Sequence, residues 1–211
     1  MSWTSLLMQH RSIAVIRAPE FEVGLEMARS VARAGIKLIE ITWNSDRPAH
    51  LIATLRQELT DCTIGAGTLI TPAQLTEAIS ADAQFLFSPH CDPDLISRAK
   101  RVEIPIVPGA LTPTEIITAW QAGANSVKVF PVHSLGGASY IRSLKSPMQG
   151  IPLIPTGGVS IENSADFIKA GAIAVGLSSE LFLPSLIQGR NWDGLHDRAK
   201  SLIDQLQPYC H

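Results

Sequence analysis

Cysteine is scarce in this sequence, with only Cys62, Cys91 and Cys210 among 211 residues. The three lie far apart and form no C-x-x-C pair, which excludes a dense disulfide framework and a cysteine-based zinc site. The six histidines form no H-x-H or H-E-x-x-H motif, so metal-assisted chemistry is not expected either. We therefore predict incidental thiols, no bound metal and no cofactor.

Charge clusters and long apolar runs are also missing. The net charge is -2 and the 17 basic residues are scattered, which argues against a surface for nucleic acid or anionic lipid. No apolar run approaches the roughly 18 residues that a membrane span needs, and no basic region precedes the short apolar patch near the start. The sequence predicts a cytoplasmic protein with no membrane or nucleic-acid partner.

Eight short apolar runs alternate with amphipathic stretches along the chain. Their spacing, roughly 20 to 26 residues, suits one crossover helix per strand. No G-x-G-x-x-G motif follows the first run, and eight βα alternations fit a closed barrel better than a doubly wound sheet. We expect an α/β fold, a single (β/α)8 TIM-barrel domain over residues 1–211. The predicted strands are 12–17, 37–43, 62–68, 84–90, 104–109, 126–131, 152–158 and 172–178.

Capping residues mark several helix boundaries. Segments 71–74 and 112–115 each place a threonine, a proline and a glutamine or glutamate in the order of a helix start. Gly35, Gly123 and Gly171 each follow an alanine, where a helix end commonly needs a left-handed residue. The helical patterns lie at 23–35, 49–59, 72–81, 113–123, 139–145, 163–171 and 196–206.

Polar residues inside the apolar runs are informative, because both faces of a strand in a parallel barrel are covered. Alternation puts Val127 and Val129 on the side that faces the helices, and Ser126, Lys128 and Phe130 on the inner side. The same rule applied to the first two strands puts Arg17, Glu40 and Thr42 on the inner side. With Lys128 they form an inward polar set toward the carboxyl ends of the strands, where barrel active sites are built.

The inward Lys128 and Glu40 each have two interpretations. They could form a structural ion pair. Alternatively, burial lowers the pKa of an amine and makes it a nucleophile for Schiff-base formation with a ketone, while a confined carboxyl group shuttles protons. Buried lysines are rare and costly to desolvate, so we favour the catalytic interpretation.

Two glycine-containing segments, 156–160 and 176–179, follow the seventh and eighth strands. In α/β barrels this pair of loops often binds phosphate through backbone N–H groups, although a Gly-Gly pair also simply makes a tight turn. Arg17 could hold a substrate carboxylate or could pair with Glu20 or Glu22 beside it.

Several motifs together resemble one enzyme family, the class I 2-dehydro-3-deoxy-6-phosphogluconate (KDPG) and 4-hydroxy-2-oxoglutarate (KHG) aldolases. The resemblance runs in order from about Ile13 to about Phe182. It is carried by Glu40, Gly65-Ala66-Gly67-Thr68, Ser88-Pro89-His90, Pro108-Gly109, Lys128-Val129-Phe130-Pro131 and Pro155-Thr156-Gly157-Gly158.

The resemblance implies a homotrimer of TIM barrels that needs no metal, with Lys128 as the Schiff-base lysine and Glu40 as the acid-base catalyst. It also implies that Thr68, Pro89, Phe130 and Thr156 contact the substrate and that Gly157, Gly158 and Ser179 hold its phosphate. With Arg17 and the inward Thr42, these residues form the expected binding site.

The expected reaction is cleavage of KDPG to pyruvate and glyceraldehyde 3-phosphate. Cleavage of 4-hydroxy-2-oxoglutarate to pyruvate and glyoxylate and slow decarboxylation of oxaloacetate are expected beside it. Asn44 stands where many members have an arginine, and Asn44-Ser45 resembles the phosphogalactonate-specific relatives, so that substrate is an alternative. Two other interpretations stay open: a sugar-phosphate isomerase or epimerase, and a non-catalytic phosphoanion-binding barrel.

Overall fold

The computed structural model describes residues 1–210 as a closed α/β barrel. Every strand pairing in it is parallel, and the strands run in the order β5-β4-β3-β2-β1-β9 and β6-β7-β8. A bridge between Thr156 and Gly176 joins β8 to β9. The strands are β1 (Ser12–Ile16), β2 (Leu38–Thr42), β3 (Thr63–Gly67), β4 (Leu86–Phe87), β5 (Ile106–Val107), β6 (Gly109–Ala110), β7 (Val127–Val129), β8 (Leu153–Pro155) and β9 (Val175–Leu177).

One predicted strand is divided. The run 104–109 forms β5, which pairs with β4, and β6, which pairs with β7, and Pro108 separates the two. Proline has no N–H to donate to a strand ladder, so the pairing breaks there. The carbonyl oxygen of Pro108 still accepts a hydrogen bond from Lys128 N at 2.9 Å. This bond connects the segment between β5 and β6 to β7.

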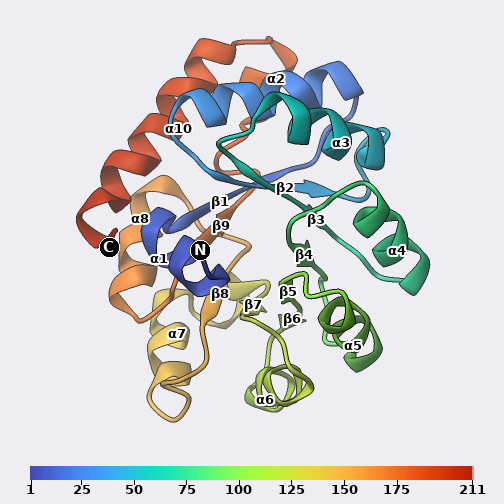
Figure 1. Ribbon diagram of the computed structural model, residues 1–211. Helices are drawn as coiled ribbons and strands as arrows, with labels where there is room; N and C mark the ends of the chain where they lie inside the picture. The colour runs from blue at the N-terminus through green and yellow to red at the C-terminus, as the bar shows by residue number, and fades with distance from the viewer. Residues whose placement is uncertain (211) are drawn as a thin grey trace.

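The helices surround the strands (Figure 1). Those predicted are α2 (Phe21–Arg33), α3 (Pro48–Glu58), α4 (Pro72–Ser80), α6 (Pro113–Ala122), α7 (Ala138–Lys145), α8 (Ile161–Lys169) and α10 (Trp192–Leu206). The sequence patterns did not single out α1 (Trp3–His10), α5 (Pro93–Arg101) and α9 (Pro184–Gln188). With five residues, α9 is too short to give a detectable periodicity, whereas α1 and α5 are as long as the predicted α7 and α4, so their length does not explain why they were missed.

Helix ends follow the expected capping chemistry. The side chain of Thr71 accepts from Gln74 N, and Thr112 with Glu115 forms a complete capping box. The three predicted glycine stops all have left-handed backbone, with φ between 103° and 110°. Burial raises the pKa of the Cys62 thiol to about 11, which fits the prediction of an incidental cysteine.

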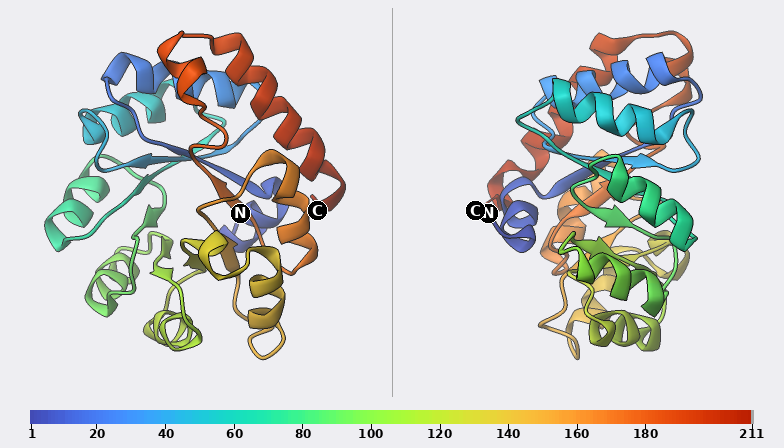
Figure 2. Two further views of the ribbon diagram at one scale, coloured as in Figure 1. Left: turned by 180° about the vertical axis from the view of Figure 1, so that it is seen from behind. Right: turned by 45° about the vertical axis from the view of Figure 1, so that its right-hand side comes forward.

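Strand alternation divides the core into two layers, as the sequence predicts. Val127 and Val129 pack in the layer between the strands and the outer helices. The barrel interior contains, among others, Ile13, Val15, Leu38, Phe85, Phe87, Val107 and Ile154. Trp3 and Leu7 of α1 join this inner cluster, and the two views in Figure 2 place α1 at one end of the barrel. Among residues 1–210, no helix has the length and apolarity needed to cross a membrane.

Candidate active site

A cavity of about 440 Å³ opens at the carboxyl ends of the strands. Ten of the predicted site residues line it, namely Arg17, Thr42, Thr68, Pro89, Lys128, Phe130, Thr156, Gly157, Gly158 and Ser179. The structure therefore brings together residues from all around the barrel, although their contacts with a substrate stay a prediction. The wall also includes Val159, Gly176 and Ser178 from the two predicted glycine-containing segments, and Val15 and Glu180, which were not predicted as site residues. Proximity to Ser179 was the available signal for Glu180.

Lys128 projects from β7 into this cavity and is only 6% exposed. Its ammonium group lies 5.0 Å from the ring centroid of Phe130 and 5.8 Å from that of Phe87. Aromatic faces attract a cation without neutralising it, unlike a carboxylate. The amine is therefore confined, free of a carboxylate hydrogen bond among residues 1–210, and open to a ligand in the cavity.

Glu40 lies on β2 and is completely buried. Neither carboxyl oxygen has a hydrogen-bond partner among the described residues, so the structural ion pair with Lys128 is not formed. Burial raises the pKa of Glu40, and the nearby charges of Lys128 and Arg17 oppose that rise. A carboxyl group whose pKa is raised in this way is suited to both giving and taking a proton.

Two threonines at strand ends show features typical of functional sites. The hydroxyl oxygen of Thr156 is buried and has no partner among residues 1–210. Thr68 adopts left-handed backbone with φ of 59°, which is uncommon for a residue with a branched Cβ. Both line the cavity. An unpaired hydroxyl and a strained backbone are costs that ligand binding can offset.

The turn after β8 is arranged as an anion cradle. Gly157 and Gly158 both have positive φ, at 83° and 86°. The carbonyl oxygen of Gly157 accepts a hydrogen bond from His133 N at 3.2 Å, and that of Gly158 accepts one from Asn163 Nδ2 at 3.0 Å. The N–H groups of Gly158 and Val159 have no acceptor within residues 1–210. Consecutive free N–H groups just before the N-cap of α8, Ser160, are suited to binding an anion.

Arg17 lines the cavity, and the alternative pairing with nearby glutamates is wrong. Glu20 pairs with Arg190 at 3.7 Å, and Glu22 pairs with Arg47 at 3.6 Å. The next residue after Arg17, Ala18, donates its N–H to Ser45 Oγ at 3.0 Å. This bond ties the loop after β1 to the loop after β2. Asn44 is exposed and is not part of the cavity wall.

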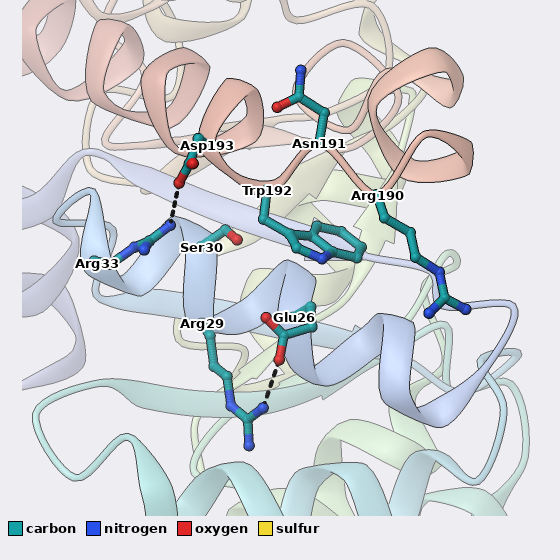
Figure 3. Close-up of a pocket in the computed structure, with 8 residues that line it drawn as sticks. All are labelled: Glu26, Arg29, Ser30, Arg33, Arg190, Asn191, Trp192 and Asp193. Carbon is teal, nitrogen blue, oxygen red and sulfur yellow. Dashed lines mark hydrogen bonds and ion pairs between the residues drawn. The ribbon is translucent and has the colours of Figure 1, made fainter.

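A second hollow, of about 430 Å³, lies between α2 and the start of α10 (Figure 3). It contains three arginines, yet each is neutralised: Arg29 by Glu26 at 2.7 Å, Arg33 by Asp193 at 3.3 Å, and Arg190 by Glu20. It thus offers no uncompensated charge to a ligand. Within residues 1–210, no three histidine, cysteine or acidic side chains cluster as a metal site would require.

The fold and the cavity define a parallel α/β-barrel enzyme with a buried lysine and a buried carboxyl group at its active end. The sequence pattern of KDPG and KHG aldolases matches residues 4–197. The chain belongs to this family, and its members are carbon-carbon lyases. The aldolase interpretation is thereby favoured over the isomerase one.

Individual relatives agree. The chain is 31% identical to the 2-dehydro-3-deoxy-phosphogluconate aldolase of Haemophilus influenzae over 94% of its length and 93% of that protein. It is 35% identical to that of Treponema pallidum over 75% of each chain.

Two solved structures are also similar. A native KDPGal structure has a TM-score of 0.86 at 30% identity, covering 94% of this chain and 95% of the other. The KDPG aldolase of Legionella pneumophila, with pyruvate captured at low pH as a covalent carbinolamine, has a TM-score of 0.89 at 25% identity, covering 96% and 98%.

Proposed function

We propose that this protein is a class I aldolase in which Lys128 forms a Schiff base with a 2-oxo acid. The observation that carries the proposal is a buried lysine that lines the cavity and makes no hydrogen bond with the buried carboxyl group of Glu40. A purely structural lysine would be paired, because an unpaired buried charge destabilises the fold. The covalent carbinolamine in the Legionella pneumophila relative supports the same chemistry.

The reaction begins when the neutral amine of Lys128 adds to C2 of the substrate. Glu40, in its acid form, protonates the hydroxyl group of the resulting carbinolamine, which leaves as water and gives an iminium ion. Glu40, as carboxylate, removes the proton of the C4 hydroxyl group, and the electrons of the C3–C4 bond move into the iminium to give an enamine. The aldehyde leaves, Glu40 returns its proton to C3, and hydrolysis releases pyruvate and the amine.

The substrate we propose is KDPG, which yields pyruvate and glyceraldehyde 3-phosphate. The anion cradle at Gly158 and Val159, together with Ser179, supports a phosphorylated substrate. The same site would cleave 4-hydroxy-2-oxoglutarate and slowly decarboxylate oxaloacetate, because the iminium stabilises any carbanion at C3. The phosphogalactonate analogue is the second candidate, supported by the native KDPGal structure and by Asn44-Ser45. Comparing kcat/KM on the three aldol substrates decides among them.

Borohydride reduction in the presence of pyruvate tests the mechanism. We expect a covalent adduct on Lys128, found by peptide mass spectrometry, and no adduct in Lys128→Ala. Lys100→Ala, which removes an exposed lysine, serves as the matched control and should still be labelled. Reversible binding of phosphate or pyruvate without an adduct in the wild type would instead identify a non-catalytic anion-binding barrel.

We also propose a homotrimer in the cytoplasm. The chain resembles, at 28% identity, a cage designed by fusing symmetric oligomeric domains, which supports self-association. Three free cysteines fit a reducing compartment. Light scattering that gives a monomeric mass would contradict the trimer.

A further inference from the structure

His133 makes an unusual double contact with the phosphate end of the cavity. It lies in η1 (Val132–Leu135), directly after the segment that carries Lys128. Its backbone N–H and its ring nitrogen Nδ1 each lie 3.2 Å from the carbonyl oxygen of Gly157. Because a carbonyl oxygen only accepts, Nδ1 carries the hydrogen in this contact. Two donors from one residue thus hold one carbonyl group.

Peptide planarity transmits this constraint to the cavity. In a trans peptide the C=O of one residue and the N–H of the next point in opposite directions. Fixing the Gly157 carbonyl toward His133 therefore directs the N–H of Gly158 away from His133. Gly158 lines the cavity, and this N–H has no acceptor in the described part of the chain.

The packing of His133 against Gly158 adds a steric constraint. A Cβ on Gly158 would overlap Cβ of His133 and would stand 2.8 Å from its Cγ. The imidazole base thus occupies the space beside this peptide and limits its rotation. Glycine is required at 158 both for this approach and for its φ of 86°.

We propose that His133 is a positioning residue that determines affinity for the phosphate group of the substrate. It acts by holding the Gly157–Gly158 peptide with its N–H directed at the anion, and does not itself react. Preorganised N–H donors bind an anion more tightly than donors that must first be ordered. This proposal rests on the aldolase function proposed above.

Steady-state kinetics of His133→Ala on phosphorylated and unphosphorylated substrates test the proposal. With the phosphorylated substrate that the wild type prefers, we expect KM to rise about 5- to 10-fold, the effect of one ordering hydrogen bond, with kcat within twofold. With 4-hydroxy-2-oxoglutarate, which lacks phosphate, kcat/KM should stay within twofold. Inhibition by inorganic phosphate should weaken by the same factor as KM rises.

Two further variants complete the design. Asn at position 133 places an N–H close to where Nδ1 lies, so His133→Asn should restore KM to within about twofold of wild type. Ser134→Ala changes the adjacent exposed residue of η1 and should have no effect. Equal losses on both substrates, no loss on either, or a wild type with no preference for phosphorylated substrates would each overturn the role of His133. Pyruvate trapping by borohydride in wild type and His133→Ala reports separately on the Schiff base, so failure of either proposal can be recognised.

Discussion

Gly67 of β3 lies directly against the carboxyl group of Glu40 on β2. A Cβ added to Gly67 would overlap Oε1 and Cδ of Glu40. The two strands are neighbours, with Thr42 opposite Gly67 and Glu40 opposite Gly65, so the carboxyl group reaches diagonally across the barrel interior. The missing side chain at 67 is what makes room for a buried acid.

Gly67→Ala should therefore displace Glu40 with no change in its chemistry. We expect kcat/KM for aldol cleavage to fall on the order of 100-fold, because a displacement of about 1 Å at a catalytic group costs that much. The free energy of unfolding should fall by about 1 to 3 kcal/mol through overpacking. Gly150→Ala is the matched control, since a Cβ there meets nothing within 4 Å. A Gly67→Ala enzyme with normal kcat/KM would remove Glu40 from the mechanism.

Glu40→Gln should lower the activity but raise the stability of the protein relative to wild type as the pH increases. The pKa of Glu40 is raised above its ordinary 4.5 by burial, so the folded protein binds this proton more tightly than the unfolded chain. The wild type is then stabilised by this group below about pH 4.5, and loses that stabilisation as pH rises through the folded pKa. Glutamine is neutral at every pH.

The free energy of unfolding of the variant should therefore rise above that of wild type as the pH increases. Above the folded-state pKa of Glu40 the difference should level off at about 1 to 3 kcal/mol, because a buried polar group without a partner costs that much. Urea unfolding at several pH values measures this difference. Activity should fall about 100-fold or more, as when a general acid-base group is lost. Glu77→Gln, at an exposed position of α4, should show neither effect. A stability difference that is constant between pH 4 and 8 would show that Glu40 titrates normally.

Strand alternation was sufficient to predict which residues face the barrel interior. Lys128, Glu40 and Ser126 are all buried, as the two-residue alternation of side chains along a strand indicates. The direction of a side chain on a strand depends only on local backbone geometry. The glycine turn after β8 was predictable for the same reason. A glycine pair after a strand is a local signal.

Relationships between strands could not be predicted. The fit of Glu40 beside Gly67 depends on register across the closed barrel, which alternation along one strand does not define. The contact between His133 and Gly157 spans 24 residues and depends on how two loops meet. Likewise α1 is short, and nothing in its sequence shows that it packs into the barrel interior.

The contact between Trp3 and Ser126 joins α1 to the residue before β7, across 123 positions of the sequence, and it gives the last prediction. The indole N–H of Trp3 donates to Ser126 Oγ at 3.0 Å, and its ring lies 5.1 Å from that of Phe85 inside the barrel. Trp3→Phe should lower the free energy of unfolding by about 2 to 4 kcal/mol, because it leaves a small cavity and an unpartnered buried hydroxyl.

Ser126→Ala removes that hydroxyl, so it should recover part of the loss in the double variant. We expect a coupling energy of about 1 kcal/mol from urea unfolding of the four proteins in the cycle. Because neither Trp3 nor Ser126 lines the cavity, kcat/KM at 25 °C should stay within about twofold of wild type in all four. Additive losses would mean that the hydrogen bond contributes nothing and that α1 is held by packing alone. A large loss of kcat/KM in Trp3→Phe with the fold intact would instead show that α1 controls the geometry of Lys128, two residues after Ser126 in the sequence.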